Sequence, residues 1–492
     1  MNTKKIVLAI IAVVFLSGNI FTAVAQDTEV TTKWGANFVP NVKNSLHTYL
    51  GEDENSYYLL TDATVVYTLE KYNKETFEHE ASKPLNRRGI KSIFSLGGET
   101  YFYGYEYEKD QEKGNGFYRF EKSKMAFEFV AGQIEGVSFD KLDSRRTSPD
   151  ESKILFAFKG SYNKKEKTRD YQLLVIDDRL KTLWKKKITI PYISDFTVDF
   201  TIDNEGNVYT ASREWHKDRK KKDKTAYNYV VMKSSADKEK RFVVNMNGYF
   251  YHKCKMLTDK NNNLLVVGFY TDRANEKNTG GYYFSMNNSF DAAENISYQQ
   301  MELFYGKKKK LHERYDDYNF GRPLYGENGD IAICSELNII VTYESASTST
   351  SASKTTKYLF LDVYVFKITE GELAWMKRVP KYEFSDGYSA FLSGDNVTLI
   401  FWDHKENMNV DEYSEKVQSV QKPLFCQLVG VTLNKNGEQA KKIIETNGLD
   451  KDLYPFLIYG KHISNNCAIF PATRVGFGSL SMKSKIGVIC VE

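Results

Sequence analysis

The sequence predicts an all-β fold built from repeated four-stranded antiparallel sheets. A polar turn followed by a short apolar segment recurs eight times along the 492 residues. Tight turns separate many of the apolar segments, as they do in antiparallel hairpins. Amphipathic helical periodicity is nearly absent. Together these three observations favour a repeat protein made of strands.

Each repeat begins with a turn rich in Asp, Asn, Gly or Glu that leads directly into apolar or aromatic residues. Gly206-Asn207 before Val208-Tyr209 is one example. In chain order, the eight apolar segments begin at residues 57, 101, 154, 208, 264, 331, 397 and 467. They lie about 59 residues apart on average, and a regular spacing on this scale indicates a repeat architecture.

Inside a unit, a second apolar segment follows a polar gap, and a tight turn then leads to a third. Residues 171–176, the turn Asp177-Asp178 and residues 183–190 show this arrangement most clearly. With the segment that precedes the polar turn, each unit holds four strands, which we designate A to D. Four-stranded antiparallel units repeated at this length are the blades of a β-propeller.

The two ends of the chain are expected to complete one blade. The eighth unit ends with its third strand at residues 486–491, and residues 29–39 are strand-like without a hairpin partner of their own. Pairing the two segments would close the ring and remove exposed sheet edges. We therefore predict eight blades, with seven as the alternative if residues 331–358 divide differently.

Two of the turns resemble known propeller repeats. Ser148-Pro149-Asp150 before residues 154–156 resembles the Ser-Pro-Asp turn of WD-like and TolB-like repeats. Residues 203–209 are similar to the D-x-x-G-N-x-Y turn of many bacterial propeller repeats. The resemblance covers nearly all of residues 26–492 in pattern, although units such as the one at residues 95–98 depart from it. In composition, the chain is also similar to uncharacterised exported propellers of Bacteroidota-type bacteria.

The N-terminus predicts export. Lys4 and Lys5 precede an unbroken apolar run at residues 6–16, and Ala23-Val24-Ala25 ends a secretory signal peptide at residues 1–25. The apolar run is too short to span a bilayer, which takes about 20 residues, and no later segment is long and apolar enough. We expect residues 26–492 to form one soluble propeller domain in the periplasm or outside the cell.

Charge and the metal-binding residue types exclude several functions. Lys+Arg 68 against Asp+Glu 64 gives a formal charge of +4, which excludes a nucleic-acid binder driven by bulk charge. The seven His and five Cys show no zinc or other metal spacing, so we expect no metal and no cofactor. If the last two strands pair so that Ile469 faces Val488, Cys467 falls opposite Cys490, and an exported protein permits that disulfide.

One face of the ring is predicted to carry the function, because the B to C connections are long. These expected loops are residues 106–116, 159–170, 213–226, 271–281, 344–357, 403–422 and 473–485. Long loops gathered on a rigid scaffold are common binding sites. Residues 159–169, 213–224 and 307–314 are strongly basic, and all three should lie on that face. The candidate ligand-binding residues are Lys164, Lys165, Arg169, Arg213, Trp215, His216, Arg219, Lys221, Lys308 and Arg314.

Two functions of different classes fit these features. The first is a non-enzymatic binding or assembly module of the cell envelope, whose loop face holds an anionic glycan or an envelope protein. The second is a carbohydrate-active enzyme, a polysaccharide lyase or a glycoside hydrolase, on the same scaffold. Tyr49, Asp199, Arg322 and Tyr388 lie in or near predicted A strands and are the candidates to meet in the central channel. We predict no catalytic residue, because no local catalytic motif is present.

Overall fold

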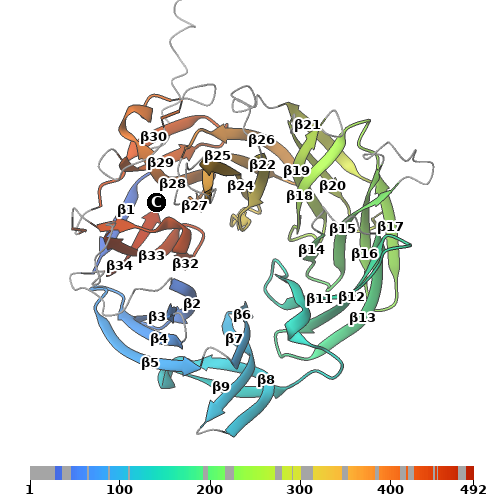
Figure 1. The fold of residues 1–492 in the computed structure, drawn as a ribbon, viewed down its shortest axis with the longest axis horizontal. Coiled ribbons are helices and arrows are strands. Elements are labelled where there is room, and N and C mark those ends of the chain that lie inside the picture. Colours follow the sequence, from blue (N-terminus) through green and yellow to red (C-terminus); the bar gives the residue numbers. More distant parts are fainter. Residues whose placement is uncertain are drawn as a thin grey trace, which may run out of the picture.

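The protein is an eight-bladed β-propeller. The computed structural model describes residues 28–35, 46–63, 66–86, 89–108, 111–191, 198–215, 227–271, 280–290, 292–300, 314–345, 353–382, 387–410, 417–418, 426–446, 449–450, 453–474 and 484–492. Their strands form eight antiparallel sheets arranged in a ring around a central channel (Figure 1). The prediction of eight blades is confirmed, and the seven-blade alternative is wrong.

Blades 1 to 7 follow the chain, each from its innermost strand outward. Blade 1 consists of β2 (Leu46–Glu52), β3 (Ser56–Ala63), β4 (Val66–Asn73) and β5 (His79–Asn86), blade 2 of β6 (Ile90–Leu96), β7 (Glu99–Glu108), β8 (Gln111–Glu121) and β9 (Ala126–Gly132), and blade 3 of β10 (Leu142–Thr147), β11 (Lys153–Asn163), β12 (Thr168–Asp177) and β13 (Thr182–Pro191). Blade 4 consists of β14 (Asp199–Ile202), β15 (Val208–Trp215), β16 (Tyr227–Ser234) and β17 (Glu239–Val244), and blade 5 of β18 (Phe250–Thr258), β19 (Leu264–Thr271), β20 (Gly280–Met286) and β21 (Glu294–Gln300). Blade 6 consists of β22 (Arg314–Phe320) with β23 (Leu324–Tyr325), β24 (Ile331–Ser345), β25 (Ser353–Thr369) and β26 (Glu372–Val379), and blade 7 of β27 (Ser389–Ser393), β28 (Asn396–His404), β29 (Cys426–Leu433) and β30 (Gln439–Ile443).

Blade 8 closes the ring with both ends of the chain. Its inner strands are β31 (Leu453–Pro455) and β32 (Lys461–His462), followed outward by β33 (Cys467–Arg474), β34 (Ser484–Val491) and β1 (Val30–Trp34). β1 pairs antiparallel with β34, with Val30 opposite Val491. The predicted closure is therefore confirmed, and the N-terminal strand is the outermost strand of the last blade.

A disulfide crosslinks blade 8. β33 and β34 pair in the register that places Ile469 opposite Val488 and Cys467 opposite Cys490. The two cysteines are bonded, and they lie 23 residues apart in the sequence. Of the remaining cysteines, Cys254 and Cys334 are buried free thiols, and burial raises the pKa of each to about 12.

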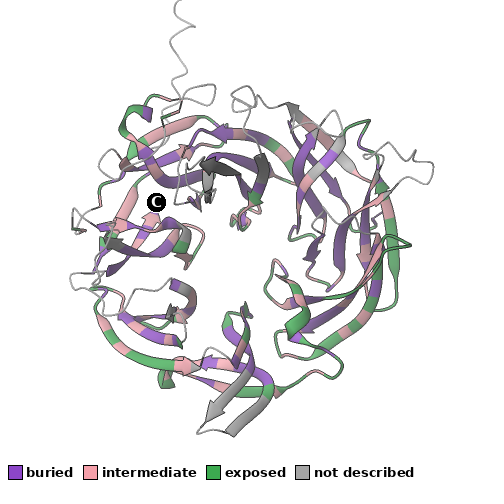
Figure 2. Ribbon diagram, in the orientation of Figure 1, coloured by how far each residue is buried: buried purple, intermediate pink, exposed green. Residues whose placement is uncertain are grey.

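The core lies between neighbouring blades and is rich in aromatic rings. Figure 2 shows buried residues mainly in the inner and middle strands of the blades, whereas exposed residues follow the outer strands. Tyr229 of blade 4 stacks on Tyr251 of blade 5, with ring centroids 4.1 Å apart. In blade 2, Phe102 stacks on Tyr118 at 4.5 Å. Large flat rings fill the wedge between twisted sheets, which explains the 34 Tyr and 31 Phe of the sequence.

The A to B turns join the blades to one another on one face of the ring. In blade 4, Asp203 accepts hydrogen bonds from the backbone amides of Glu205 and Asn207, and Gly206 takes a φ of +85° that a side chain disfavours. Asn204, the residue after Asp203, accepts a hydrogen bond at its Oδ1 from the backbone amide of Asp150 in blade 3. The D-x-x-G-N turn of this chain is therefore anchored by its Asp and contacts the neighbouring blade.

The opposite face differs from the prediction of long loops. Several of the expected B to C loops are extensions of the strands instead. β7 and β8 pair as far as Glu108 and Gln111, and β24 and β25 pair as far as Ser345 and Ser353. In the described part of these two segments, residues 106–108, 111–116, 344–345 and 353–357 therefore belong to strands and not to loops. The polar composition of these segments suggested loops. However, a hairpin that extends strands of an existing sheet continues their backbone hydrogen bonds, so it needs no apolar core of its own.

Candidate functional site

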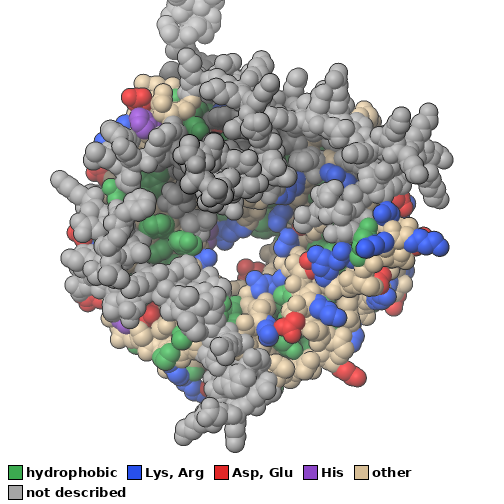
Figure 3. All heavy atoms as spheres, viewed as in Figure 1, with side chains coloured by type: hydrophobic (Ala, Val, Ile, Leu, Met, Phe, Trp, Pro, Cys, Tyr) green, Lys and Arg blue, Asp and Glu red, His purple; other side chains and the backbone are tan. Residues whose placement is uncertain are grey.

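Basic side chains gather around the central channel. Figure 3 shows Lys and Arg atoms at the rim of the opening. The innermost strands carry Lys91, Arg146, Lys253, Lys255 and Lys461, and Arg322 lies two residues after the end of β22. Two of these cations have carboxylate partners, since Lys91 pairs with Asp140 at 2.8 Å and Arg146 pairs with Asp199 at 2.9 Å.

Asp199 sits among more positive charges than it can neutralise. One of its oxygens accepts from Arg146, and the other accepts from the backbone amide of Met256 at 2.8 Å. Lys255 is also held near Asp199, yet burial lowers the pKa of its ammonium group, and the charge of Arg146 lowers it further. Arg145, the residue before Arg146, instead donates to Oγ of Ser92 in blade 2 at 2.8 Å. Blades 3 and 5 thus place two cations, Arg146 and Lys255, near the one carboxylate of Asp199.

Across the ring, the inner strands of blades 6, 7 and 8 surround a cavity of about 390 Å³, which we call the inner cavity. Blade 6 contributes Arg322, Glu336 and Asn338, blade 7 contributes Tyr388, and blade 8 contributes His462. β23 contacts β27 next to this cavity, so the short strand that follows Arg322 helps to bring blades 6 and 7 together.

Arg322 is the cation of the inner cavity. Its Nη2 donates to the backbone oxygen of Ser464 in blade 8 at 3.0 Å. Burial lowers the pKa of its guanidinium to about 10, so it remains charged at pH 7. Burial and the charge of Arg322 together lower the pKa of His462 to about 3, so this imidazole is neutral at pH 7. The inner cavity therefore holds one fixed positive charge beside a neutral ring.

Two polar atoms of the inner cavity are buried without a partner. Nδ1 of His462 and Oδ1 of Asn338 make no hydrogen bond to any residue that the structure describes. Buried polar groups are nearly always paired, so such an exception calls for an explanation. Both atoms belong to residues that line the same cavity, yet each has almost no accessible surface, so neither faces the open volume.

The carboxylate of the inner cavity is neutralised by its own lysine. Glu336 accepts from Nζ of Lys381 at 2.6 Å, and the lysine side chain is fully buried. Burial raises the pKa of Glu336, and the charge of Lys381 opposes that rise. Lys381 lies beside a second buried pair, Asp362 with Arg378 at 2.7 Å. These pairs join the strands of blade 6, and the excess charge of the cavity remains that of Arg322.

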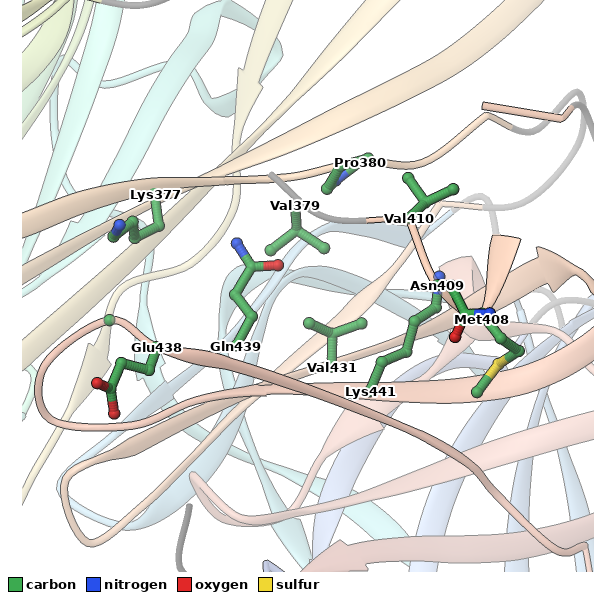
Figure 4. Close-up of a pocket in the computed structure, with 11 residues that line it drawn as sticks. Lys377, Val379, Pro380, Met408, Asn409, Val410, Val431, Glu438, Gln439 and Lys441 are labelled. Atoms are coloured by element: carbon green, nitrogen blue, oxygen red, sulfur yellow. The ribbon is translucent and has the colours of Figure 1, made fainter. Parts of the chain in front are cut away.

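A second cavity, of about 420 Å³, lies between the outer parts of blades 6 and 7 (Figure 4). Val379 and Val431 face each other across it, with Lys377 and Glu438 at one end and Met408 at the other. Its polar groups already have partners: Gln439 donates to the backbone oxygen of Arg378 at 2.7 Å, and Lys441 donates to Asp403 and to the backbone of Asn407. This outer cavity is mainly a packing gap between two blades.

The structure describes the side chains of four of the predicted loop residues. Lys164 and Lys165 are exposed at the turn between β11 and β12, and Arg169 on β12 places its guanidinium 5.4 Å from the ring centre of Tyr162. Arg213 instead donates to the backbone oxygen of Tyr251 at 2.6 Å and so joins blades 4 and 5.

The remaining candidates are placed only by their backbone or not at all. Trp215 ends β15 opposite Tyr227, and Arg314 begins β22 opposite Val341. Four of the predicted residues lie outside the described part of the chain: His216, Arg219, Lys221 and Lys308.

Of the four predicted channel residues, only two share a site. Arg322 and Tyr388 both line the inner cavity. Asp199 lies across the ring with Arg146, and Tyr49 donates to Glu52 at 3.0 Å within blade 1. The sequence reading missed His462, Asn338 and Lys255. A usable signal was present for Lys255 and His462, since each lies in the strand that leads into an A to B turn.

Comparison with known proteins gives no family. No family model matches the chain, and no curated protein matches it in sequence. Among solved structures, it is similar to the β-propeller domain of the trilobed protease from Pyrococcus furiosus, with a TM-score of 0.37 and 9% identity over 82% of this chain and 97% of that chain. It is also similar to the polysaccharide lyase Uly1, with a TM-score of 0.37 and 10% identity over 91% and 99% of the two chains.

A third similar structure is the α-L-arabinanase of Penicillium chrysogenum, with a TM-score of 0.31 and 11% identity over 72% of this chain and 95% of that chain. Likeness at this level carries no argument about ligand or activity. Among the described residues, no group of His, Cys, Asp and Glu is arranged to hold a metal ion, and no helix has the length and apolarity to cross a membrane. The likeness to exported propellers of Bacteroidota-type bacteria stays a prediction.

Proposed function

We propose that this protein is an exported, non-enzymatic binding module of the cell envelope that holds an anionic glycan. The observation that supports this function best is the set of partly desolvated cations at the inner edge of the blades. Burial lowers the pKa of Lys255, Lys461 and Arg322, because water is removed from these groups without a full counter-ion. An anionic ligand would supply the missing negative charge.

The hairpin between β11 and β12 extends the same preference outward. Lys164, Lys165 and Lys167 are exposed at its turn, with Glu166 as the one acidic residue among them. Clustered exposed charges of one sign attract oppositely charged ligands and speed their association, in a way that salt weakens. A polyanion could contact the hairpin while one of its units enters the channel. An acidic protein partner would use the same charges.

The enzyme alternative has one observation in its favour. Arg322, Tyr388 and His462 line the same cavity, and a cation beside two proton-carrying side chains is an arrangement that lyases can use. However, an efficient acid or base has a pKa near the working pH. The pKa of His462 falls to about 3, and burial raises that of Tyr388 well above its usual value. Both shifts disfavour proton transfer at neutral pH, so we favour binding.

Charge reversal on the predicted face tests the binding function. Lys164, Lys165, Arg219 and Lys221 are replaced together by Glu, and binding to polygalacturonate and to neutral dextran is measured at low and high salt. We expect salt-sensitive binding of polygalacturonate by the wild type, at least a tenfold loss in the variant, and no binding of dextran. Mass spectrometry of the incubated polymer reports any product, and product release would favour the enzyme instead.

The control variant makes the same change of charge on the opposite face. Lys181, Lys238, Lys260 and Lys435 are exposed in the A to B and C to D turns. Replacing all four by Glu should lower polygalacturonate binding much less than the first charge-reversal variant does. Equal losses in the two variants would mean that net charge alone drives binding, and unchanged binding in the first variant would contradict the proposed function.

A further inference from the structure

We propose that the inner cavity binds one sugar-acid unit, a polyhydroxylated ring that bears a carboxylate, with Arg322 as the partner of that carboxylate. This inference rests on the proposed function and names its ligand more narrowly. It concerns a defined cavity between blades 6, 7 and 8, whereas the proposed function concerns the charge of the whole face.

The cavity has the size and walls that such a unit requires. Its volume of about 390 Å³ falls in the range of small-molecule sites, which hold ligands from about 300 Å³ upward. Phe320, Phe360 and Tyr388 contribute aromatic side chains to its lining. The apolar face of a sugar ring packs well against aromatic rings, which supply contact area at a low cost in conformational entropy. The walls thus fit a flat, partly apolar ligand.

The charge balance of the cavity selects an anion. Arg322 donates through Nη2 to a backbone oxygen, which leaves other N–H groups of its guanidinium unassigned. The remaining ionised group in the lining, Glu336, is paired with Lys381. A carboxylate therefore meets net positive charge, and the planar guanidinium is suited to bind it.

Calorimetric titration of the purified protein tests the assignment, with D-galacturonate and tri-galacturonate as probes and D-galactose as the neutral homologue. We expect saturable binding of an acid and none of galactose. Arg322→Gln should weaken binding of the acid by about 10- to 100-fold, because it removes a charge-assisted contact. Binding of the trimer alone would identify a unit within a polymer as the ligand, and binding of the monomer would identify a free sugar acid.

Lys238→Gln is the control, because it removes an exposed cation from the turn between β16 and β17 of blade 4, across the ring from the cavity (Figure 1). Its affinity for the acid should stay within about twofold of the wild type, since distant sites are nearly independent. Should Arg322→Gln fail to fold, the ring resonances of His462 in the wild type, assigned with His462→Gln, provide a second readout. They should shift on addition of galacturonate.

Three results would overturn this assignment: no binding of either acid, equal binding of galactose, or unchanged affinity in Arg322→Gln. Its failure is distinguishable from that of the proposed function. If polygalacturonate binds through the basic hairpin while neither small acid binds, the cavity assignment fails alone. If galacturonate binds in the cavity while charge reversal leaves polygalacturonate binding unchanged, the proposed function fails alone.

Discussion

His462 shows how one residue acquires its properties from its neighbours. It stands at the inner edge of blade 8, where burial and the charge of Arg322 disfavour its protonated form. Its ring also packs against Phe391 of blade 7, with centroids 5.1 Å apart. No local spacing of His with other metal or catalytic residues drew attention to it in the sequence. Its role depends on two blades that the chain reaches before blade 8, so only the folded ring makes it visible.

The shifted pKa of His462 predicts a loss of stability in mild acid. The unfolded chain protonates this residue near pH 6.5, whereas the folded protein resists protonation down to about pH 3. Between these values the unfolded state binds more protons, so the free energy of unfolding falls as the pH falls. We expect His462→Gln to flatten this slope in urea titrations at pH 7.0 and pH 4.5. Identical slopes in variant and wild type would show that the imidazole protonates in the folded protein.

At the scale of the element, the turns were predictable and the hairpins were not. The turn at residues 203–209 is specified locally, because Asp203 binds amides only two and four residues ahead. The eight apolar segments found by this pattern all fall in the second strands of the blades. By contrast, residues 344–357 contain so many Ser and Thr that they read as a loop, yet Glu344 pairs with Lys354. Pairing that continues from a buried sheet requires no apolar pattern of its own.

The contact between turns predicts a measurable cost for one side chain. Asn204→Ala removes the acceptor for the amide of Asp150 in the neighbouring blade and should lower the free energy of unfolding by about 1 kcal/mol. Asn436→Ala is the matched control. This exposed Asn lies in a C to D turn, where its backbone amide, and not its side chain, donates to Oδ1 of Asn434. Urea unfolding of both variants compares them. Equal stabilities would mean that water replaces the Asn204 acceptor without loss.

At the scale of the whole molecule, the ring could be predicted from the repeated pattern, whereas the cavity could not, because it does not follow the repeat. Each blade repeats the same pattern, so counting apolar segments was enough to count blades. The inner cavity does not repeat: it depends on Arg322, Asn338 and His462, which come from two blades about 140 residues apart in the chain. Its residues lie on inner strands that the pattern located, but nothing in the sequence specifies which inner strands face each other across a gap.

Ring closure through the first strand leads to a prediction about the stability of the whole propeller. β1 is an outer strand, so its amides alternate between pairing with β34 and facing away. The backbone amide of Glu492 donates to the backbone oxygen of Glu29, and the amide of Gly35 donates to the backbone oxygen of Ile486. Because hydrogen-bonded pairs recur at every second residue, the amide of Lys33 points toward β34 and that of Thr32 points away from it. Lys33→Pro should therefore lower the free energy of unfolding by about 1–3 kcal/mol more than Thr32→Pro does, because it leaves an acceptor of β34 without its donor.

Thermal and urea unfolding of the two proline variants provide the measurement. Both carry the same restriction on φ, so their difference isolates the hydrogen bond that closes the ring. The disulfide between Cys467 and Cys490 holds β33 to β34 in both variants, so a loss in Lys33→Pro reports detachment of β1 and not of the whole blade. If the two variants unfold alike, the first strand adds little to closure, and the other four strands of blade 8 hold the ring by their packing against blades 1 and 7.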